Sequence, residues 1–247
     1  MSARLHALAN PARFGRFARR ALPWMAWLAA LCIGIGAVWG LVFAPPGATP
    51  PEGQGETVRI IYVHVPAAWM SLFIYSFMAG AAVITLIWRI KLAECVMTSC
   101  APIGASFTAL ALVTGMLWGK PMWGAYWVWD PRLTSELVLL FLYFGYMGLR
   151  AGIEDPVKAD KASAMLAVVG VINVPIIKFS VEWWTSLHQA PTVMQMGKPK
   201  MDSAMLWPLL LMFLAFALYF IAVLLIRLRA ELLRRERNAS WVREVLT

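Results

Sequence analysis

Two of the three histidines, His64 and His188, lie in polar segments between apolar runs, and each has tryptophans close by in the sequence. Neutral imidazole is a good ligand for iron and other transition metals. Two imidazoles brought together by a fold can hold one metal from opposite sides. The third histidine, His6, stands in a basic N-terminal tail, and we assign it no role.

The segment 118–133 is dense in aromatic side chains, with glycines and prolines between them. Membrane interfaces attract tryptophan and tyrosine, but an interfacial belt needs only one or two rings at each helix end. In a helix, residues 123 and 127 would share a face; in an extended chain, residues 127 and 129 would. The sequence leaves both arrangements open, and either gives a platform of paired rings. Its members are Trp118, Trp123, Tyr126, Trp127 and Trp129.

These residue types suit a flat macrocycle of haem size. Such a group needs aromatic surface, one or two imidazoles for its iron and donors for its carboxylates. His64 and His188 are the predicted axial ligands, and Trp184, four residues before His188, is expected to pack beside the ring from a shared helix. Arg59 and Arg132 are the predicted partners of the propionates, because guanidinium binds carboxylate in a bidentate manner.

Acidic residues flank this platform. Asp130 precedes Pro131 and is expected either to cap the following helix or to pair with Arg132. Glu136 and Glu182 lie near the membrane interface, where an acid is often paired or functional, yet the sequence names no partner for either.

Composition indicates how these residues are positioned. The chain has 247 residues, of which 61% are hydrophobic and 14% charged, so lipid is the expected solvent. A spanning helix needs about 20 apolar residues, and Pro175 should kink the fifth run. We predict an all-α, polytopic membrane protein in one domain, 1–247, with six transmembrane helices at about 23–44, 66–88, 98–118, 134–150, 162–180 and 204–227.

The positive charges predict the orientation. Sixteen of the 22 Lys and Arg residues fall at the termini and in the segments after the second and fourth runs. The positive-inside rule therefore places both termini in the cytoplasm, and the histidine segments on the opposite side. The tail 227–247 is predicted to form a basic amphipathic helix on the inner membrane surface. The same distribution explains the net charge of +9 without nucleic acid.

Enzyme chemistry is not indicated. Cys32, Cys95 and Cys100 show no CxxC, CxxCH or zinc spacing, so we expect them to be structural. The chain has no nucleotide-binding loop, no nucleophile paired with a base and no paired carboxylates in one segment. Binding and handover of a ligand are the expected activity.

The segment resembles a known motif. Trp118-Gly-x4-Gly-x2-Trp127-x-Trp129-Asp130-Pro-Arg132-Leu-Thr is similar to the WWD signature of haem-handling proteins in cytochrome c maturation. Within that superfamily, the length, the six spans and one histidine in each flanking outer loop resemble the CcmC family. The larger CcmF proteins and system II synthetases have more spans and more histidines.

This resemblance implies a function in cytochrome c-type biogenesis. It implies that haem b is held non-covalently at the periplasmic face of the bacterial inner membrane, between His64, His188 and the WWD segment, and is delivered to the haem chaperone CcmE. It further implies CcmD as a companion and the CcmAB ABC transporter as the releaser of the loaded chaperone. The alternative is a b-type cytochrome subunit of a redox complex. Such subunits usually ligate haem deep within helices, and neither histidine falls in a predicted span.

Overall fold

The computed structural model describes residues 11–46, 54–188, 193, 201–239 and 241–242, and this part of the chain contains helices and no strand. Six helical segments are long and apolar enough to cross a membrane. The predicted all-α, six-span fold is thus confirmed, and the chain is a multi-pass membrane protein. Residues 1–10 and 243–247, which hold His6 and the end of the predicted tail helix, lie outside the described part.

The described part of the chain is built from successive helices. The first span is α2 (Pro11–Val38), which runs into a π-helical turn, η1 (Trp39–Phe43). A 3-10 helix, η2 (Gly55–Ile60), leads into α3 (Ile61–Trp88). The remaining elements are α4 (Lys91–Trp123), α5 (Pro131–Gly152), α6 (Pro156–Gly170), α7 (Asn173–Trp183) and α8 (Ser203–Arg235). Most helices extend beyond their apolar runs, because backbone hydrogen bonding does not stop where the side chains become polar.

Aspartates start three of the helices. Asp130 accepts a hydrogen bond from the backbone N–H of Arg132 at 2.9 Å, and Asp155 accepts one from Val157 at 2.8 Å. Both are followed by a proline at the first helical position, where the missing N–H costs little. Asp202 caps α8 in the same way. The predicted capping role of Asp130 is therefore confirmed.

The fifth span is broken where the proline requires it. The α-helical hydrogen-bond pattern is interrupted at residues 171–172, between α6 and α7, although both residues keep right-handed helical dihedral angles, and Pro175 lies in the first turn of α7. Pro175 has no N–H to donate to the carbonyl four residues earlier, and its ring would crowd that carbonyl. Asn173 then donates from Nδ2 to the backbone oxygen of Ser135 at 2.9 Å, which holds α7 on α5.

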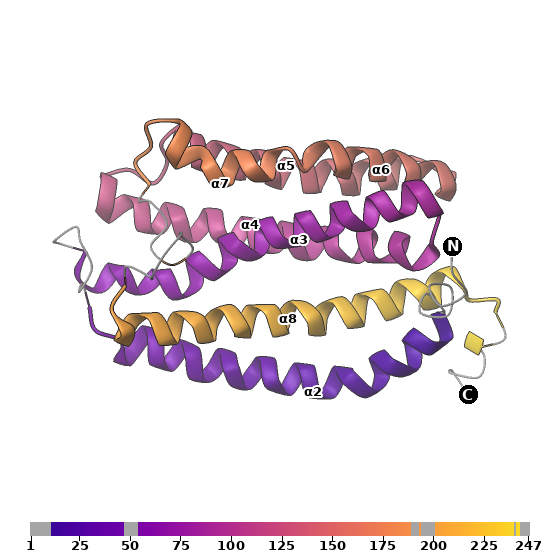
Figure 1. Ribbon diagram of the computed structural model, residues 1–247, viewed down its shortest axis with the longest axis horizontal. Coiled ribbons are helices and arrows are strands. Elements are labelled where there is room, and N and C mark those ends of the chain that lie inside the picture. Colours follow the sequence, from indigo (N-terminus) through magenta and orange to yellow (C-terminus); the bar gives the residue numbers. More distant parts are fainter. Residues whose placement is uncertain (1–10, 47–53, 189–192, 194–200, 240, 243–247) are drawn as a thin grey trace.

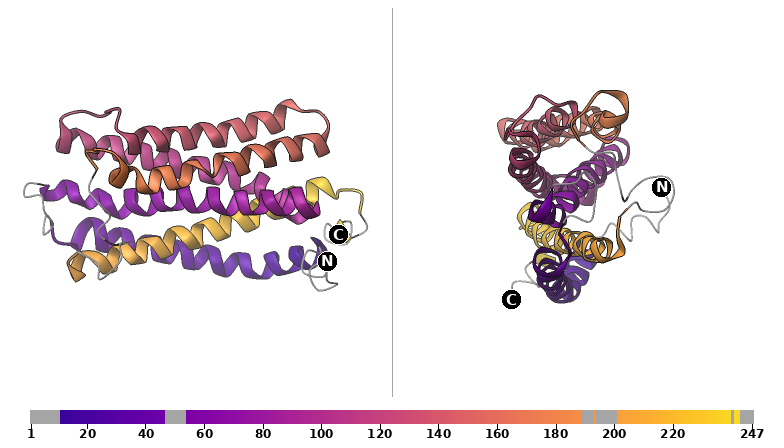
Figure 2. Two further views of the ribbon diagram at one scale, coloured as in Figure 1. Left: turned by 45° about the horizontal axis from the view of Figure 1, so that its top comes forward. Right: turned by 90° about the vertical axis from the view of Figure 1, so that its left-hand side faces the viewer.

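The helices lie side by side in a flattened bundle. α2 pairs with α8 along one edge, α5 lies with α6 and α7 along the other, and α3 and α4 form the centre (Figures 1 and 2). Side chains of α3 such as Tyr62, Ile74 and Tyr75 are fully buried there. Trp27 of α2 is 76% exposed in the bundle, as expected for a ring that faces lipid.

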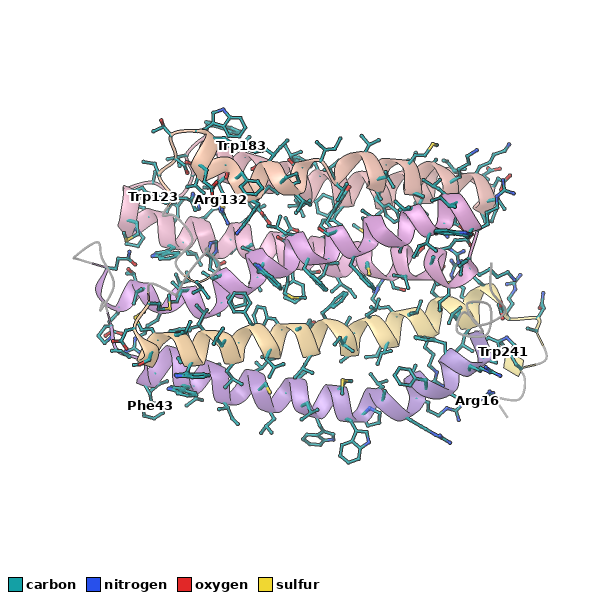
Figure 3. All side chains as sticks on the ribbon, in the orientation of Figure 1. Arg16, Phe43, Trp123, Arg132, Trp183 and Trp241 are labelled. Carbon is teal, nitrogen blue, oxygen red and sulfur yellow. The ribbon has the colours of Figure 1, made fainter. Side chains whose placement is uncertain are left out.

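The two ends of the bundle differ. Phe43, Trp123 and Trp183 lie at one end, and Arg16 and Trp241 lie at the other (Figure 3). The first, third and fifth spans therefore end on the same side, as predicted from the alternating direction of successive spans.

The basic C-terminal segment corrects one prediction. Residues 227–235 are helical, but they continue α8 instead of forming a separate surface helix. Arg235 explains this, because its guanidinium reaches inward to Glu94 and Asp160, each at 3.0 Å, and to Glu231 at 2.7 Å. Ion pairing with neighbouring helices holds the end of α8 against the bundle.

Candidate functional site

His64 lies on a helix, not in the loop where we predicted it. It is the fourth residue of α3, because η2 continues directly into α3 five residues before Pro66. The apolar run is thus shorter than the helix that carries it. His64 faces α4 from this position.

The ring of His64 is held in one tautomer. Its Nδ1 lies 3.0 Å from the backbone oxygen of Ala111 and 3.0 Å from Oγ1 of Thr114, both on α4. A carbonyl oxygen can only accept, so Nδ1 carries the proton. Nε2 therefore keeps its lone pair, as a metal-ligating histidine with a fixed second nitrogen requires.

Close approach of α4 to this ring depends on Gly115. A Cβ at that position would lie 3.1 Å from Cε1 of His64. Trp118, one turn later, meets the same imidazole edge-on, with ring centroids 5.7 Å apart at 74°. The sequence analysis missed Ala111, Thr114 and Gly115, because their roles follow from helix packing and not from any motif.

His188 lies in a non-helical segment after α7. We predicted that Trp184 and His188 share a helix, and this is wrong. α7 ends at Trp183, and Trp184 is extended with φ −133° and ψ 156°. The ring of Trp184 instead meets that of Trp183 edge-on, with centroids 5.7 Å apart.

Asp130 causes the change of direction. Its Oδ2 accepts hydrogen bonds from Oγ of Ser186 at 2.7 Å and from the backbone N–H of Leu187 at 2.9 Å. Its Oδ1 accepts the cap bond from Arg132 and lies 3.4 Å from Nδ1 of His188, without hydrogen-bond geometry. One carboxylate thus joins the WWD segment to the segment that carries the second histidine.

Electrostatics at this end favour a neutral imidazole. Burial, and to a smaller extent the nearby charge of Arg132, lowers the pKa of His188 to about 4 against the opposing effect of Asp130. Burial would raise the pKa of Asp130, but the hydrogen bonds from Ser186, Leu187 and Arg132 outweigh it and lower that pKa. At neutral pH the site therefore contains an uncharged His188 beside an ionised Asp130.

The WWD segment takes the extended arrangement. α4 ends at Trp123, and Gly124 follows with a φ of +77°, a value that favours glycine. Beyond it Trp127 and Trp129 pair edge-on, with centroids 5.5 Å apart at 84°. Trp123 lies against His188 instead, with centroids 5.0 Å apart. Each histidine therefore has a tryptophan of α4 beside it.

Arg132 is close enough to both histidines to influence them electrostatically. Its charge acts on both His64 and His188. Among the described residues no hydrogen bond or ion pair engages its guanidinium. Figure 3 shows Arg132 at the same end as Trp123 and Trp183. A cation placed in this way can accept an anionic ligand.

The other predicted polar residues have separate contacts. Arg59 pairs with Glu56 and donates to the backbone oxygen of Leu41 at 2.8 Å. Glu136 is buried and accepts a hydrogen bond from Oγ of Ser71 at 2.6 Å, which supplies the partner that the sequence did not name. Glu182 is exposed.

Two aromatic residues of the platform are open to the surroundings. Trp129 is 78% exposed and Tyr126 is 54% exposed. Lys120 lies over the ring of Tyr126 at 5.4 Å and donates to the backbone oxygen of Gly124 at 3.0 Å. These rings can contact a ligand or a partner without rearrangement of the buried core.

Comparison with known proteins gives the family. The family model CcmC, described as "Heme exporter protein C", matches residues 4–243. The chain belongs to the CcmC family. A relative from Bradyrhizobium diazoefficiens is 48% identical over 92% of this chain and 85% of its own length. The relative from Haemophilus influenzae is 45% identical over 97% and 96% of the two chains, and that from Escherichia coli K12 is 46% identical over 98% and 96%.

All three CcmC relatives carry the name "Heme exporter protein C". In the present CcmC chain, six of the predicted site residues lie at one end of the bundle. Ring contacts and the Asp130–His188 approach join some of them, and the charge of Arg132 acts on both histidines. They are His64, Trp118, Trp123, Asp130, Arg132 and His188. Trp127 and Trp129 form a neighbouring pair.

Proposed function

We propose that the chain binds haem b between His64 and His188 and delivers it for cytochrome c maturation. The observation that carries this proposal is a pair of imidazoles, each with a tryptophan ring against it, near the guanidinium of Arg132, which forms no ion pair among the described residues. Membership of a family whose relatives are named heme exporters supports the same ligand.

Haem is the cargo, and each residue has a distinct part in holding it. Nε2 of His64 and of His188 would ligate the iron, since Nδ1 faces an acceptor in the first and lies beside a carboxylate in the second. Trp118 and Trp123 would pack at the ring, and Arg132 would bind a propionate. Arg59 remains a predicted propionate ligand that would first have to leave Glu56.

Delivery, in preference to retention, suits the position of the site. His188 and the WWD segment lie at the end of the bundle, where Trp129 is exposed and a water-soluble partner can approach. We propose CcmE as the acceptor, CcmD as a small companion, and the CcmAB transporter as the component that releases loaded CcmE. The activity is binding, orientation and handover, without an enzymatic step of this chain's own.

The membrane placement follows from charge. We propose the bacterial inner membrane, with both termini cytoplasmic and the histidine end periplasmic. Arg16 of α2 lies at the opposite end of the bundle from Trp123 (Figure 3), and the basic end of α8 lies at the same end as the start of α2 (Figure 1).

A transfer assay tests the proposal. Haem-loaded protein in detergent is mixed with the soluble domain of CcmE, the two are separated, and haem is measured in each. We expect haem to move to CcmE from the wild type, and transfer to be lost with Trp129→Ala. Trp27→Ala is the matched control, because this ring has similar exposure but lies on the lipid-facing side of α2.

A b-type cytochrome subunit is the second candidate, and the helical position of His64 is the observation that favours it. A redox subunit keeps its haem when CcmE is added. Retention of haem by the wild-type protein in the transfer assay would therefore support the cytochrome and contradict delivery.

A further inference from the structure

A cavity lies away from the histidines. It is a groove of about 360 Å³ between α2, α4 and α8, and it follows α4 from Leu110 to Pro102, about 12 Å of helix. Its walls are mainly apolar, with Ile33, Phe107 and Phe216 among them. α2 and α4 both pack on α8 and leave this groove between them.

The groove adjoins a larger cavity, here called the polar chamber, which is lined by many charged residues. That cavity has a volume of about 870 Å³ and is lined by the ends of α4, α5, α6 and α8. Pro102 and Arg227 line both spaces, so the two adjoin each other. The apolar groove therefore lies beside the polar chamber, and the chamber is at the end of the bundle that carries Arg16 and Trp241 (Figure 3).

Most charges deep in the polar chamber neutralise one another. Arg235 binds Glu94, Asp160 and Glu231, and Arg150 pairs with Asp160. Asp160 is 5% exposed, so this network is part of the protein's interior. It forms a fixed floor that leaves little charge for a ligand.

The rim of the chamber is different, because it carries uncompensated positive charge. Within the described part of the chain, neither Arg227 nor Arg237 has a hydrogen bond or ion pair. The Nζ of Lys91 lies 3.5 Å from Oε1 of Glu236, and the Lys91 side chain is 73% exposed, so this ion pair is weak. Among the described residues of the rim, Glu154 is the acid without an ion-pair partner. One free acid against two free arginines leaves the net charge of the rim positive.

We propose that this groove and chamber hold one anionic phospholipid of the leaflet opposite the histidine site. An acyl chain occupies the apolar groove, and the phosphate group binds Arg227, which stands where the two spaces meet. Basic pockets between transmembrane helices on the cytoplasmic side bind anionic lipid headgroups, because their positive side chains attract the phosphate. The positive charge at the rim attracts an anion, and the adjoining apolar groove accommodates an acyl chain. Together they favour an amphiphile over a simple anion.

Native mass spectrometry of the purified full-length protein with added phosphatidylglycerol tests this site. Removal of one arginine near the headgroup should weaken lipid binding about fivefold, which corresponds to about 1 kcal/mol. We expect this loss for Arg227→Gln. Arg229→Gln is the matched control, because it removes the same charge two residues further along α8 and lines neither space. Equal affinities of these two variants would overturn the proposal.

Further arms separate the alternatives. Ser106→Phe fills the apolar groove without a change of charge and should also reduce phosphatidylglycerol binding. Phosphatidylcholine should bind more weakly, and inorganic phosphate should not displace the lipid. Full displacement by phosphate would mean a simple anion site. Unchanged lipid binding by Ser106→Phe, with loss of a co-purifying membrane subunit, would mean that the groove holds a protein helix. Either result contradicts a lipid site.

An unchanged elution profile in size-exclusion chromatography shows that each variant is folded.

Discussion

Replacement of Asp130 by asparagine should release the segment that carries His188. The carboxylate uses its two oxygens for different partners: Oδ1 accepts from the backbone N–H of Arg132, and Oδ2 accepts from Ser186 and from the N–H of Leu187. Asparagine has one oxygen, so one backbone N–H must lose its acceptor whichever way the amide turns. Asp130 is 5% exposed, so water does not readily replace the lost bond.

The size of the effect follows from these bonds. A hydrogen bond to a charged group contributes about 1.5–3 kcal/mol, which corresponds to an opening equilibrium about 10-fold to 150-fold more favourable. If the amide keeps its oxygen toward Arg132, the bond lost is that of Leu187. Its amide hydrogen should then exchange faster by that factor, and the histidine beside it should lose its position.

Hydrogen exchange measured by mass spectrometry on peptides that cover 184–188 is the assay, with a haem spectrum of the same samples. Asp155→Asn is the matched control, because Asp155 also caps a helix but is distant from the site and exposed. Unchanged exchange at 184–188 in Asp130→Asn, together with a wild-type haem spectrum, would refute the role assigned to this carboxylate.

Three further predictions follow from the same structure. Gly115→Ala places a Cβ 3.1 Å from the histidine of α3 and should weaken haem affinity by about 1–3 kcal/mol, measured by haem titration, whereas Gly148→Ala, with no atom within 4 Å, should not. The pKa of His188 is lowered from 6.5 to about 4, so the unfolded chain binds that proton more tightly; stability of the haem-free protein should fall as pH drops from 6.5 to 4, and His188→Gln should flatten this part of the Tm profile. Arg235→Gln should lower the free energy of unfolding by about 1–3 kcal/mol, because Glu94 loses its ion-pair partner while Asp160 keeps Arg150 and Glu231 keeps Arg234, whereas Arg234→Gln, 65% exposed, should cost less than about 1 kcal/mol.

The spans could be predicted from the sequence because lipid imposes a simple rule. A run of about 20 apolar residues must be helical, since no water is present to satisfy its backbone. Helix ends could not be placed equally well. The start of α3 at Ile61 and the end of α8 at Arg235 depend on a preceding 3-10 helix and on ion pairs with other helices.

The candidate site was predictable in its residue types but not in its connections. His64, His188 and the tryptophans were recognisable by chemistry and by the WWD motif. That Asp130 would bind the segment of His188, 56 to 58 residues away in sequence, depends on tertiary contact. The same contact ends the helix in which Trp184 and His188 were expected to share a face, because it holds residues 186 and 187 out of the helical path.

Chemical rescue of the two histidines tests the central claim most directly. His64→Gly and His188→Gly are purified, loaded with haem, and examined by absorption spectroscopy before and after addition of imidazole. Each variant should lose the wild-type spectrum and recover it when free imidazole enters the vacated space. A double variant that keeps the wild-type haem content and spectrum without imidazole would show that the iron is held by other residues.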